Sequence, residues 1–175
     1  MRILMLTSVY KDEFLGNKDT STNIVNSFVK EWKKQGHEVL VIHNSHCYPR
    51  VIHEIPEKLK KSLAARMGFA ISDYDAVKEK EYQDNGVKVF RLPIKKFIPH
   101  SQPSDNVIKR QVNKIVATLK KEKFEPDVIT GHWASPQMEI ISELKTIYHC
   151  KTAVVLHGTG YIESPKFNAE EYLKN

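Results

Sequence analysis

Short apolar runs alternate with longer amphipathic segments along this chain, and no other feature restricts its fold as strongly. The strand-like runs are 2–9, 38–43, 87–92, 127–130 and 152–156. The first is apolar almost throughout, as is typical of a strand buried on both faces of a parallel sheet. Alternating strands and helices of this kind predict an α/β fold with a mainly parallel sheet.

Helical periodicity fills the intervals between these runs. In 23–35, apolar residues recur at helical spacing, and we expect Ile24, Phe28, Val29 and Trp32 to face the core. Thr20, Ser21 or Thr22 can cap the start of this helix, and Gly36 can end it. Further helices are predicted for 57–67, 106–121 and 137–148, with a short one near the end of the chain.

Residues 44–84 interrupt the alternation, and we expect them to form an insertion between the second and third strands of the sheet. No composition shift or linker divides the chain further. We therefore predict one domain over 1–175, with the insertion at about 44–84.

The composition excludes several classes of protein. The chain is 41% hydrophobic and 27% charged, which is ordinary for a globular protein and unlike collagen or a disordered chain. No apolar run approaches the ~20 residues that span a bilayer, and the apolar start is too short for a signal peptide. Cys47 and Cys150 form no disulfide framework. We expect a cytoplasmic protein, whose net charge of +6 favours anionic partners.

Candidate binding residues follow the first, fourth and fifth strands. In open α/β sheets, ligands bind at the carboxyl ends of the strands, where the strand order reverses. The loops at those ends contain Gly16 and Asn17; His132, Trp133 and Ser135; and His157, Gly158 and Gly160. The first loop has neither the dinucleotide fingerprint G-x-G-x-x-G nor a P-loop, so those nucleotide sites are excluded.

Each of these residues also has a purely structural interpretation. Gly16 can let a ligand phosphate approach the backbone, or it can simply form a turn. His157 can hydrogen-bond a sugar or a phosphate, or it can cap loop carbonyls. Trp133 can present its ring to a sugar, or it can belong to the core.

Taken together, several segments resemble a known family. The order MRILMLTSVY, GN, STNIVNSFVKEWKKQGHEVLVI, PDVITGHWASP and TAVVLHGTG is similar to the amino-terminal domain of family-4 retaining glycosyltransferases of the GT-B fold. The resemblance covers nearly the whole chain except the insertion. It implies a Rossmann-like three-layer sandwich, one half of a GT-B fold, that binds the acceptor.

The resemblance also implies roles for individual residues. Gly16 matches the loop glycine that approaches the donor diphosphate, and Asn17 occupies the position of a second glycine. His157, followed by Gly158, matches the histidine that faces the reacting sugar, and it is our predicted catalytic residue. Gly160 replaces an aspartate of many members. His132 and Trp133 are further candidates for donor or acceptor binding.

Members of this family have a second domain that binds most of the nucleotide-sugar and stabilises the leaving diphosphate without a metal. We expect that donor-binding domain to be absent from this chain. Glu163 and Glu171 show the spacing of its E-x7-E motif, which we attribute to chance. The predicted substrates are a nucleotide-sugar and a sugar or lipid-linked acceptor, as in polysaccharide biosynthesis, with no cofactor and no metal. The chain alone is expected to transfer no sugar at a useful rate.

Other signals support weaker alternatives. His43, His46, Cys47 and His53 are potential zinc ligands, but their spacing matches no familiar zinc site. The basic helix 56–67 has Leu59, Leu63 and Met67 on one face. This face can either contact the inner face of an anionic membrane or pack on the domain. A rival function is a non-catalytic, flavodoxin-like module that binds a nucleotide or phosphosugar. A reading frame that continues past Asn175 into a second α/β domain would favour the enzyme. A nucleic-acid-binding protein ranks last, because no recognition motif accompanies the charge.

Overall fold

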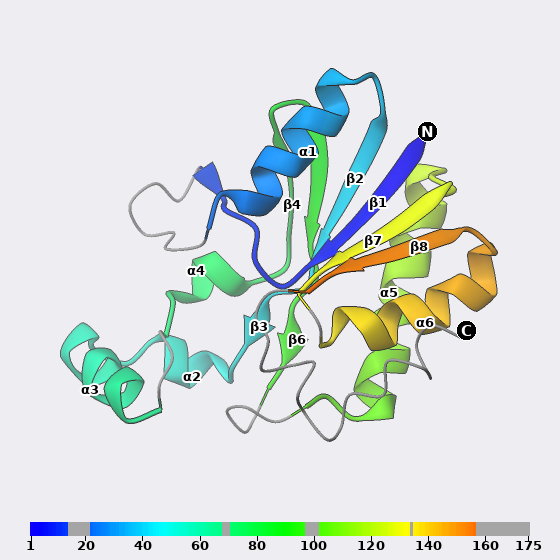
Figure 1. The fold of residues 1–175 in the computed structure, drawn as a ribbon. Coiled ribbons are helices and arrows are strands. Elements are labelled where there is room, and N and C mark those ends of the chain that lie inside the picture. The colour runs from blue at the N-terminus through cyan, green and yellow to red at the C-terminus, as the bar shows by residue number, and fades with distance from the viewer. Residues whose placement is uncertain (14–21, 68–70, 97–101, 134, 157–175) are drawn as a thin grey trace.

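The fold is built on one six-stranded sheet. A computed structural model of the chain describes residues 1–13, 22–67, 71–96, 102–133 and 135–156, and in it the strand order is β4-β5-β2-β1-β7-β8 (Figure 1). The strands are β1 (Arg2–Thr7), β2 (Glu38–His43), β4 (Lys80–Asp84), β5 (Val87–Arg91), β7 (Val128–His132) and β8 (Lys151–Val155). All neighbours are parallel except the antiparallel pair β4–β5. The predicted mainly parallel α/β fold is therefore confirmed.

Helices cover both faces of this sheet. Helix α1 (Ile24–Lys34) lies on one face, and α5 (Asp105–Glu122) and α6 (Gln137–Tyr148) lie on the other (Figure 1). Alternate side chains of β1 point to opposite faces of the sheet. Leu4 and Leu6 pack in the cluster under α5 and α6, whereas Ile3 and Met5 pack in the cluster under α1. This alternation produces the three-layer, Rossmann-like sandwich that the sequence predicted.

The core face of α1 differs from the prediction. Val25 and Val29 are fully buried, but Ile24 is 47% exposed and Phe28 is 44% exposed. The helix is turned so that the buried Asn26 also faces inward, where its amide hydrogen-bonds the backbone of Lys11. Asn26, which holds the preceding loop, therefore occupies part of the buried face of α1, where the periodicity predicted only apolar side chains.

Strand β4 is the main element that the sequence analysis did not predict. It forms a hairpin with β5 through Asn85 and Gly86, whose φ angles are +49° and +76°. Two successive positive φ values are typical of the type I′ turns that join tight hairpins. Segment 44–84 therefore supplies an edge strand to the main sheet, in addition to β3 (His46–Cys47), α2 (Arg50–His53), α3 (Glu57–Met67) and α4 (Tyr74–Val77).

A second, two-stranded parallel sheet extends half of the main sheet. It pairs β3 with β6 (Ile94–Lys95), and these strands follow β2 and β5 respectively. The Leu92 N–H donates to the His43 carbonyl at 3.0 Å, and the Ile94 N–H donates to the Ser45 carbonyl at 2.8 Å. The backbone ladder thus continues past the carboxyl ends of β2 and β5. By contrast, β1 and β7 lead directly into loops.

Helix α3 buries a lysine rather than the leucine expected there. Lys60 is 5% exposed and its ammonium donates to Asp73 at 2.6 Å, whereas Leu59 is 57% exposed. Of the two interpretations of this helix face, packing on the domain therefore does not hold for Leu59, since Lys60 is turned inward to Asp73 instead. Across the described ranges, no helix is long and apolar enough to cross a membrane.

Candidate binding edge at the β1–β7 switch point

The strand order reverses between β1 and β7. From β1 the chain crosses through α1 to β2 on one side, and from β7 it crosses through α6 to β8 on the other. Thr7 pairs with His132 at the carboxyl ends of these two strands. Ser8 and Trp133 are the next residues along each strand. The fold therefore brings them to the edge where Rossmann-like proteins bind their ligands.

Of the candidate residues that the structure describes, His132 and Trp133 lie at this edge, whereas the Ser135 hydroxyl donates to Glu139 Oε1 at 2.8 Å. His132 is fully buried, with its ring centroid 5.8 Å from that of Phe28 and 6.0 Å from that of Trp133. Trp133 is half-buried and has a φ angle of +75°. Its backbone N–H donates to the Val155 carbonyl at 3.1 Å. A positive φ is uncommon for a bulky residue, so the backbone is constrained where the tryptophan leaves β7.

The remaining predicted site residues fall outside the described part of the chain. These are Gly16, Asn17, His157 and Gly158, together with Gly160 and the chance pair Glu163 and Glu171. The short helix predicted near the end of the chain also lies there. Their roles stay predictions.

A buried chain of side-chain amides leads to Ser8. Gln111 of α5 donates to Asn44 Oδ1 at 2.8 Å, Asn44 donates to Gln137 Oε1 at 2.7 Å, and Gln137 donates to Ser8 Oγ at 2.7 Å. The three amide side chains are 0–4% exposed, whereas Ser8 is partly exposed. We call Gln111, Asn44 and Gln137 the amide relay. It connects both helices of one layer to the carboxyl ends of β1 and β2.

The direction of the amide relay is fixed at its inner end. The Gln111 amide nitrogen also donates to the backbone carbonyl of Leu92 at 2.8 Å, and a carbonyl can only accept. Gln111 must therefore present its NH2 group to Asn44, and each later amide is oriented in turn. As a result, Ser8 Oγ accepts the last hydrogen bond of the relay.

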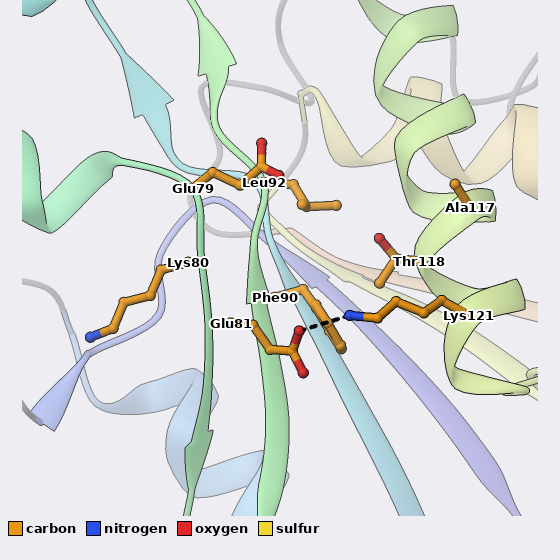
Figure 2. A pocket seen from close by; sticks show the side chains of 8 residues that line it. All are labelled: Glu79, Lys80, Glu81, Phe90, Leu92, Ala117, Thr118 and Lys121. Atoms are coloured by element: carbon orange, nitrogen blue, oxygen red, sulfur yellow. Dashed lines mark hydrogen bonds and ion pairs between the residues drawn. The ribbon is translucent and has the colours of Figure 1, made fainter.

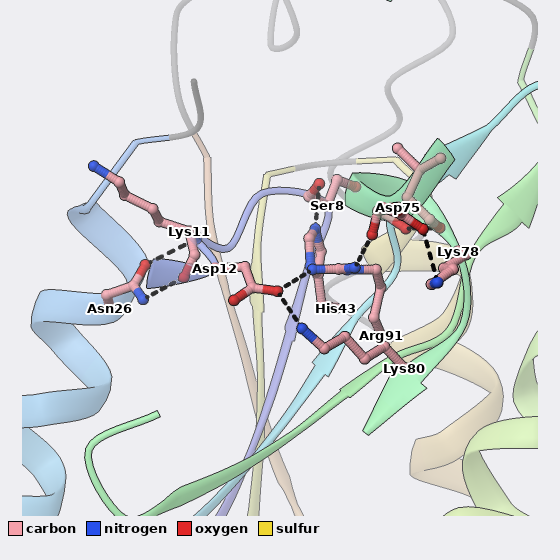
Figure 3. A network of polar contacts seen from close by, with 11 residues as sticks. Ser8, Lys11, Asp12, Asn26, His43, Asp75, Lys78, Lys80 and Arg91 are labelled. Atoms are coloured by element: carbon pink, nitrogen blue, oxygen red, sulfur yellow. Dashed lines mark hydrogen bonds and ion pairs between the residues drawn. The ribbon is translucent and has the colours of Figure 1, made fainter. Parts of the chain in front are cut away.

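The start of the β1–α1 loop is held on the opposite face of the sheet. The Tyr10 hydroxyl donates to Asp84 at 2.8 Å, and the Asn26 amide donates to the same carboxylate at 3.1 Å. Asn26 also accepts from the Lys11 N–H and donates to its carbonyl (Figure 3). Burial, followed by the hydrogen bond to Asp84, raises the pKa of the Tyr10 phenol, so this hydroxyl stays protonated.

An ion cluster holds the next turn of the same loop. Asp12 Oδ2 accepts from Arg91 Nη2 at 2.8 Å and from Lys80 Nζ at 3.1 Å, and Arg91 Nη1 donates to the Asp75 carbonyl (Figure 3). The Asp12 and Arg91 side chains are 0% and 1% exposed. Both charges are thus removed from water and compensated by each other, so they anchor the loop to β4 and β5.

Three of the four candidate zinc ligands have other side-chain contacts in the described structure: His43 Nε2 lies near the Ser8 carbonyl, the Cys47 thiol donates to the Tyr48 carbonyl, and His53 bonds two backbone groups. His53 Nε2 accepts from the Tyr48 N–H at 3.0 Å, so the other nitrogen, Nδ1, carries the proton that is donated to the Ser72 carbonyl at 2.8 Å. Burial lowers the pKa of His46 to about 4, with Lys96 as a second cause. No group of three or more His, Cys, Asp or Glu side chains in the described ranges is arranged to hold a metal.

A pocket of about 450 Å³ lies away from the switch point, between α5 and strands β4 and β5 (Figure 2). Phe90, Leu92 and Ala117 form its apolar lining, and the Glu81–Lys121 ion pair of 3.1 Å crosses it. Its charged rim and apolar floor are separate from the polar residues around Ser8.

The strand order and the helix layers define a Rossmann-like α/β domain, with the candidate binding edge between β1 and β7. Comparisons with known proteins show a similarity of fold alone. No protein-family model and no curated protein matches the chain. Among solved structures, trehalose-6-phosphate synthase from E. coli, a GT-B glycosyltransferase bound with UDP-2-fluoro glucose, has a TM-score of 0.53 and 9% identity. The match covers 99% of this chain and 37% of the synthase. The chain therefore has a GT-B-like fold.

A second solved structure is the carboxyl-terminal domain of a hydrogenase from Pyrococcus furiosus. It has a TM-score of 0.37 and 16% identity, with 89% of this chain and 90% of that domain covered.

Ser8 and the amide relay were not predicted from the sequence. One signal was present: Gln111 interrupts the apolar face formed by Ile108, Val112 and Ile115 of α5. A polar residue on a buried helix face requires a hydrogen-bond partner. The partner itself could not be identified, because Asn44 lies 67 residues earlier in the chain.

Proposed function

We propose that this chain is the acceptor-side domain of a retaining glycosyltransferase, of the family-4 type, that transfers a sugar from a nucleotide-sugar to an acceptor. One observation supports the proposal most: within a GT-B-like fold, Ser8 and Trp133 lie at the carboxyl edge where the strand order reverses. The resemblance adds His157 as the catalytic residue and Gly16, Asn17 and Gly158 as donor contacts. His132 and Trp133 complete the proposed set.

Binding of the donor is the first test of this proposal. Residues 1–175 are titrated with UDP-glucose and a panel of other nucleotide-sugars in a calorimeter, and at least one is expected to bind. The chain has only two tryptophans, Trp32 and Trp133. In the Trp32→Phe variant, the emission of Trp133 should change on titration.

Trp133→Phe is the matched control, because Trp32 packs against the cluster under α1 and not at the binding edge. Its emission should stay constant when the same ligands are added. A panel that produces neither heat nor a change in Trp133 emission would contradict the proposed function.

Turnover is the second test. Charge on a leaving diphosphate must be stabilised by preorganised cations or dipoles, and we expect a second domain to supply them. Residues 1–175 alone should bind a nucleotide-sugar without rapid transfer. Robust transfer of a radiolabelled sugar by these residues would overturn that expectation. Binding without transfer by any longer product of the gene would favour the alternative, a non-catalytic nucleotide- or phosphosugar-binding module.

We also propose that α3 contacts an anionic membrane surface and thereby serves a lipid-linked acceptor. The supporting observation is that Leu59 is 57% exposed beside Lys58 and Lys61, which are exposed as well. Apolar and basic side chains on one exposed helix favour binding to anionic lipid headgroups.

Vesicle sedimentation tests this contact. The protein should sediment with vesicles of phosphatidylglycerol and phosphatidylcholine more than with phosphatidylcholine alone, and Leu59→Ser should reduce the difference. Ile147→Ser is the control, since Ile147 is 48% exposed on the distant α6. Equal sedimentation with both vesicle types would argue against membrane contact.

A further inference from the structure

Ser8 has a hydroxyl whose hydrogen-bonding role is set by the protein around it. Its oxygen accepts from Gln137 at 2.7 Å, so the hydroxyl hydrogen cannot point along that bond. Within the described ranges, no acceptor receives this hydrogen. The residue is partly exposed, so the hydrogen is directed to the accessible side of the edge.

The backbone of Ser8 is held as firmly as its side chain. His43 Nε2 lies 3.2 Å from the Ser8 carbonyl oxygen, and Figure 3 shows this contact from the end of β2. Thr7, immediately before it, is fully buried, and its hydroxyl contacts the Val9 backbone. A side chain whose position is already held loses little entropy when it binds a ligand.

The geometry points to Ser8 as a ligand-binding residue that donates its hydrogen bond to an oxygen of the nucleotide-sugar, with Gln137 as the residue that positions it. This inference rests on the proposed function. A phosphate oxygen and a sugar hydroxyl oxygen both accept such a bond, and the bond to the charged phosphate is the stronger.

The orientation of the amide relay explains why a donor is expected. Were Gln111 turned the other way, its carbonyl would face the Leu92 carbonyl, and two acceptors would meet in a buried position. The relay therefore excludes the arrangement in which Ser8 donates inward to Gln137. A ligand group that accepts hydrogen bonds is favoured at Ser8.

Calorimetric titration of the wild type, Ser8→Ala and Ser8→Thr with UDP-glucose, UDP and uridine tests the inference. If Ser8 donates to a phosphate, Ser8→Ala should weaken UDP and UDP-glucose roughly 10- to 100-fold and leave uridine unchanged. If it donates to the sugar, only UDP-glucose should weaken, by roughly 2- to 10-fold. Ser8→Thr keeps the hydroxyl and should bind as the wild type does.

The positioning role of Gln137 is tested through Ser8. Gln137→Met removes the hydrogen bond, so it should weaken UDP-glucose several-fold in the wild type but not in a Ser8→Ala background. Ser62→Ala, on the exposed part of α3, is the matched serine control and should change nothing. Circular dichroism and urea unfolding show that each variant is folded.

Three outcomes would overturn the inference. If the wild type binds UDP-glucose and Ser8→Ala binds it equally well, Ser8 makes no contact and the proposed function survives. If Gln137→Met weakens binding equally in both backgrounds, it does not act through Ser8. If the wild type binds none of the three probes or any other nucleotide-sugar, the proposed function and the inference fail together.

Discussion

Removal of the Asp12 carboxylate should destabilise the protein far more than removal of a surface carboxylate. The Asp12 and Arg91 side chains are 0% and 1% exposed, and Asp12 Oδ2 lies 2.8 Å from Arg91 Nη2. Asp12→Ala therefore leaves a buried guanidinium without its counter-ion. Loss of one partner of a buried pair typically costs about 3–5 kcal/mol. Arg91 keeps the Asp75 carbonyl, so the lower end, about 3 kcal/mol, is expected.

Urea unfolding followed by circular dichroism measures this loss, and Glu79→Ala is the matched control. Glu79 pairs with Lys114 at 3.0 Å, but the two side chains are 62% and 49% exposed. Exposed pairs contribute only about 0–1 kcal/mol, so the Glu79 variant should unfold almost as the wild type does. The comparison isolates burial, because the two ion pairs have similar lengths.

A double variant separates the lost attraction from the uncompensated charge. Asp12→Ala combined with Arg91→Met removes both buried charges, so it should be less destabilised than the sum of the two single variants. Equal free energies of unfolding for Asp12→Ala and Glu79→Ala would refute the reasoning. So would a double variant whose loss equals that sum.

Two further perturbations probe packing and protonation. In Gly131→Ala, the new methyl would lie 2.7 Å from Ile141 Cδ1 and 3.1 Å from Gln137 Cβ, so the Ile141 side chain must move and Gln137 must give way slightly; urea unfolding should show a loss of about 1–3 kcal/mol, and an unchanged midpoint would contradict this packing. His46 has its pKa lowered from 6.5 to about 4 by burial and by Lys96, so the unfolded chain binds the proton more readily. Stability should therefore fall as the pH drops from about 6.5 to about 4, by at most roughly 3 kcal/mol, and His46→Gln should lose that dependence; parallel pH profiles of the two proteins would argue against it.

The central strands could be predicted because burial on both faces leaves a direct mark on the sequence. β1 and β2 are nearly continuous apolar runs, and both lie within one or two residues of the predicted bounds. Edge strand β4 reads KEYQD, with only Tyr82 apolar, because one side of it faces solvent. Its remaining signal in the sequence is the Asn85–Gly86 turn.

Helix rotation was predicted less well, since polar contacts changed it. In α1 the inward-facing Asn26 displaces Phe28, and in α3 the pair Lys60–Asp73 displaces Leu59. Hydrophobic periodicity assigns such polar residues to the surface. Their buried positions depend on partners that become neighbours only after folding.

The edge that carries His132 and Trp133 could be predicted from the sequence, whereas the polar network beside it could not. Topology alone places the ends of β1 and β7 together, so His132 and Trp133 were found at one edge. The amide relay joins Ser8, Asn44, Gln111 and Gln137, and none of these belongs to a recognisable motif. Hydrogen bonds between residues 67 to 129 positions apart leave no periodic signal in a single sequence.

The carboxyl edge of the sheet divides into a half that secures the fold and a half where we propose that the ligand binds. At the ends of β2 and β5, the backbone groups are hydrogen-bonded in the ladder that leads to β3 and β6, and the Arg91 charge is paired with Asp12. At the ends of β1 and β7, Ser8 is partly exposed and held by buried neighbours. Substitutions at Ser8 should therefore alter ligand affinity with little effect on the free energy of unfolding, whereas Asp12→Ala should lower the free energy of unfolding.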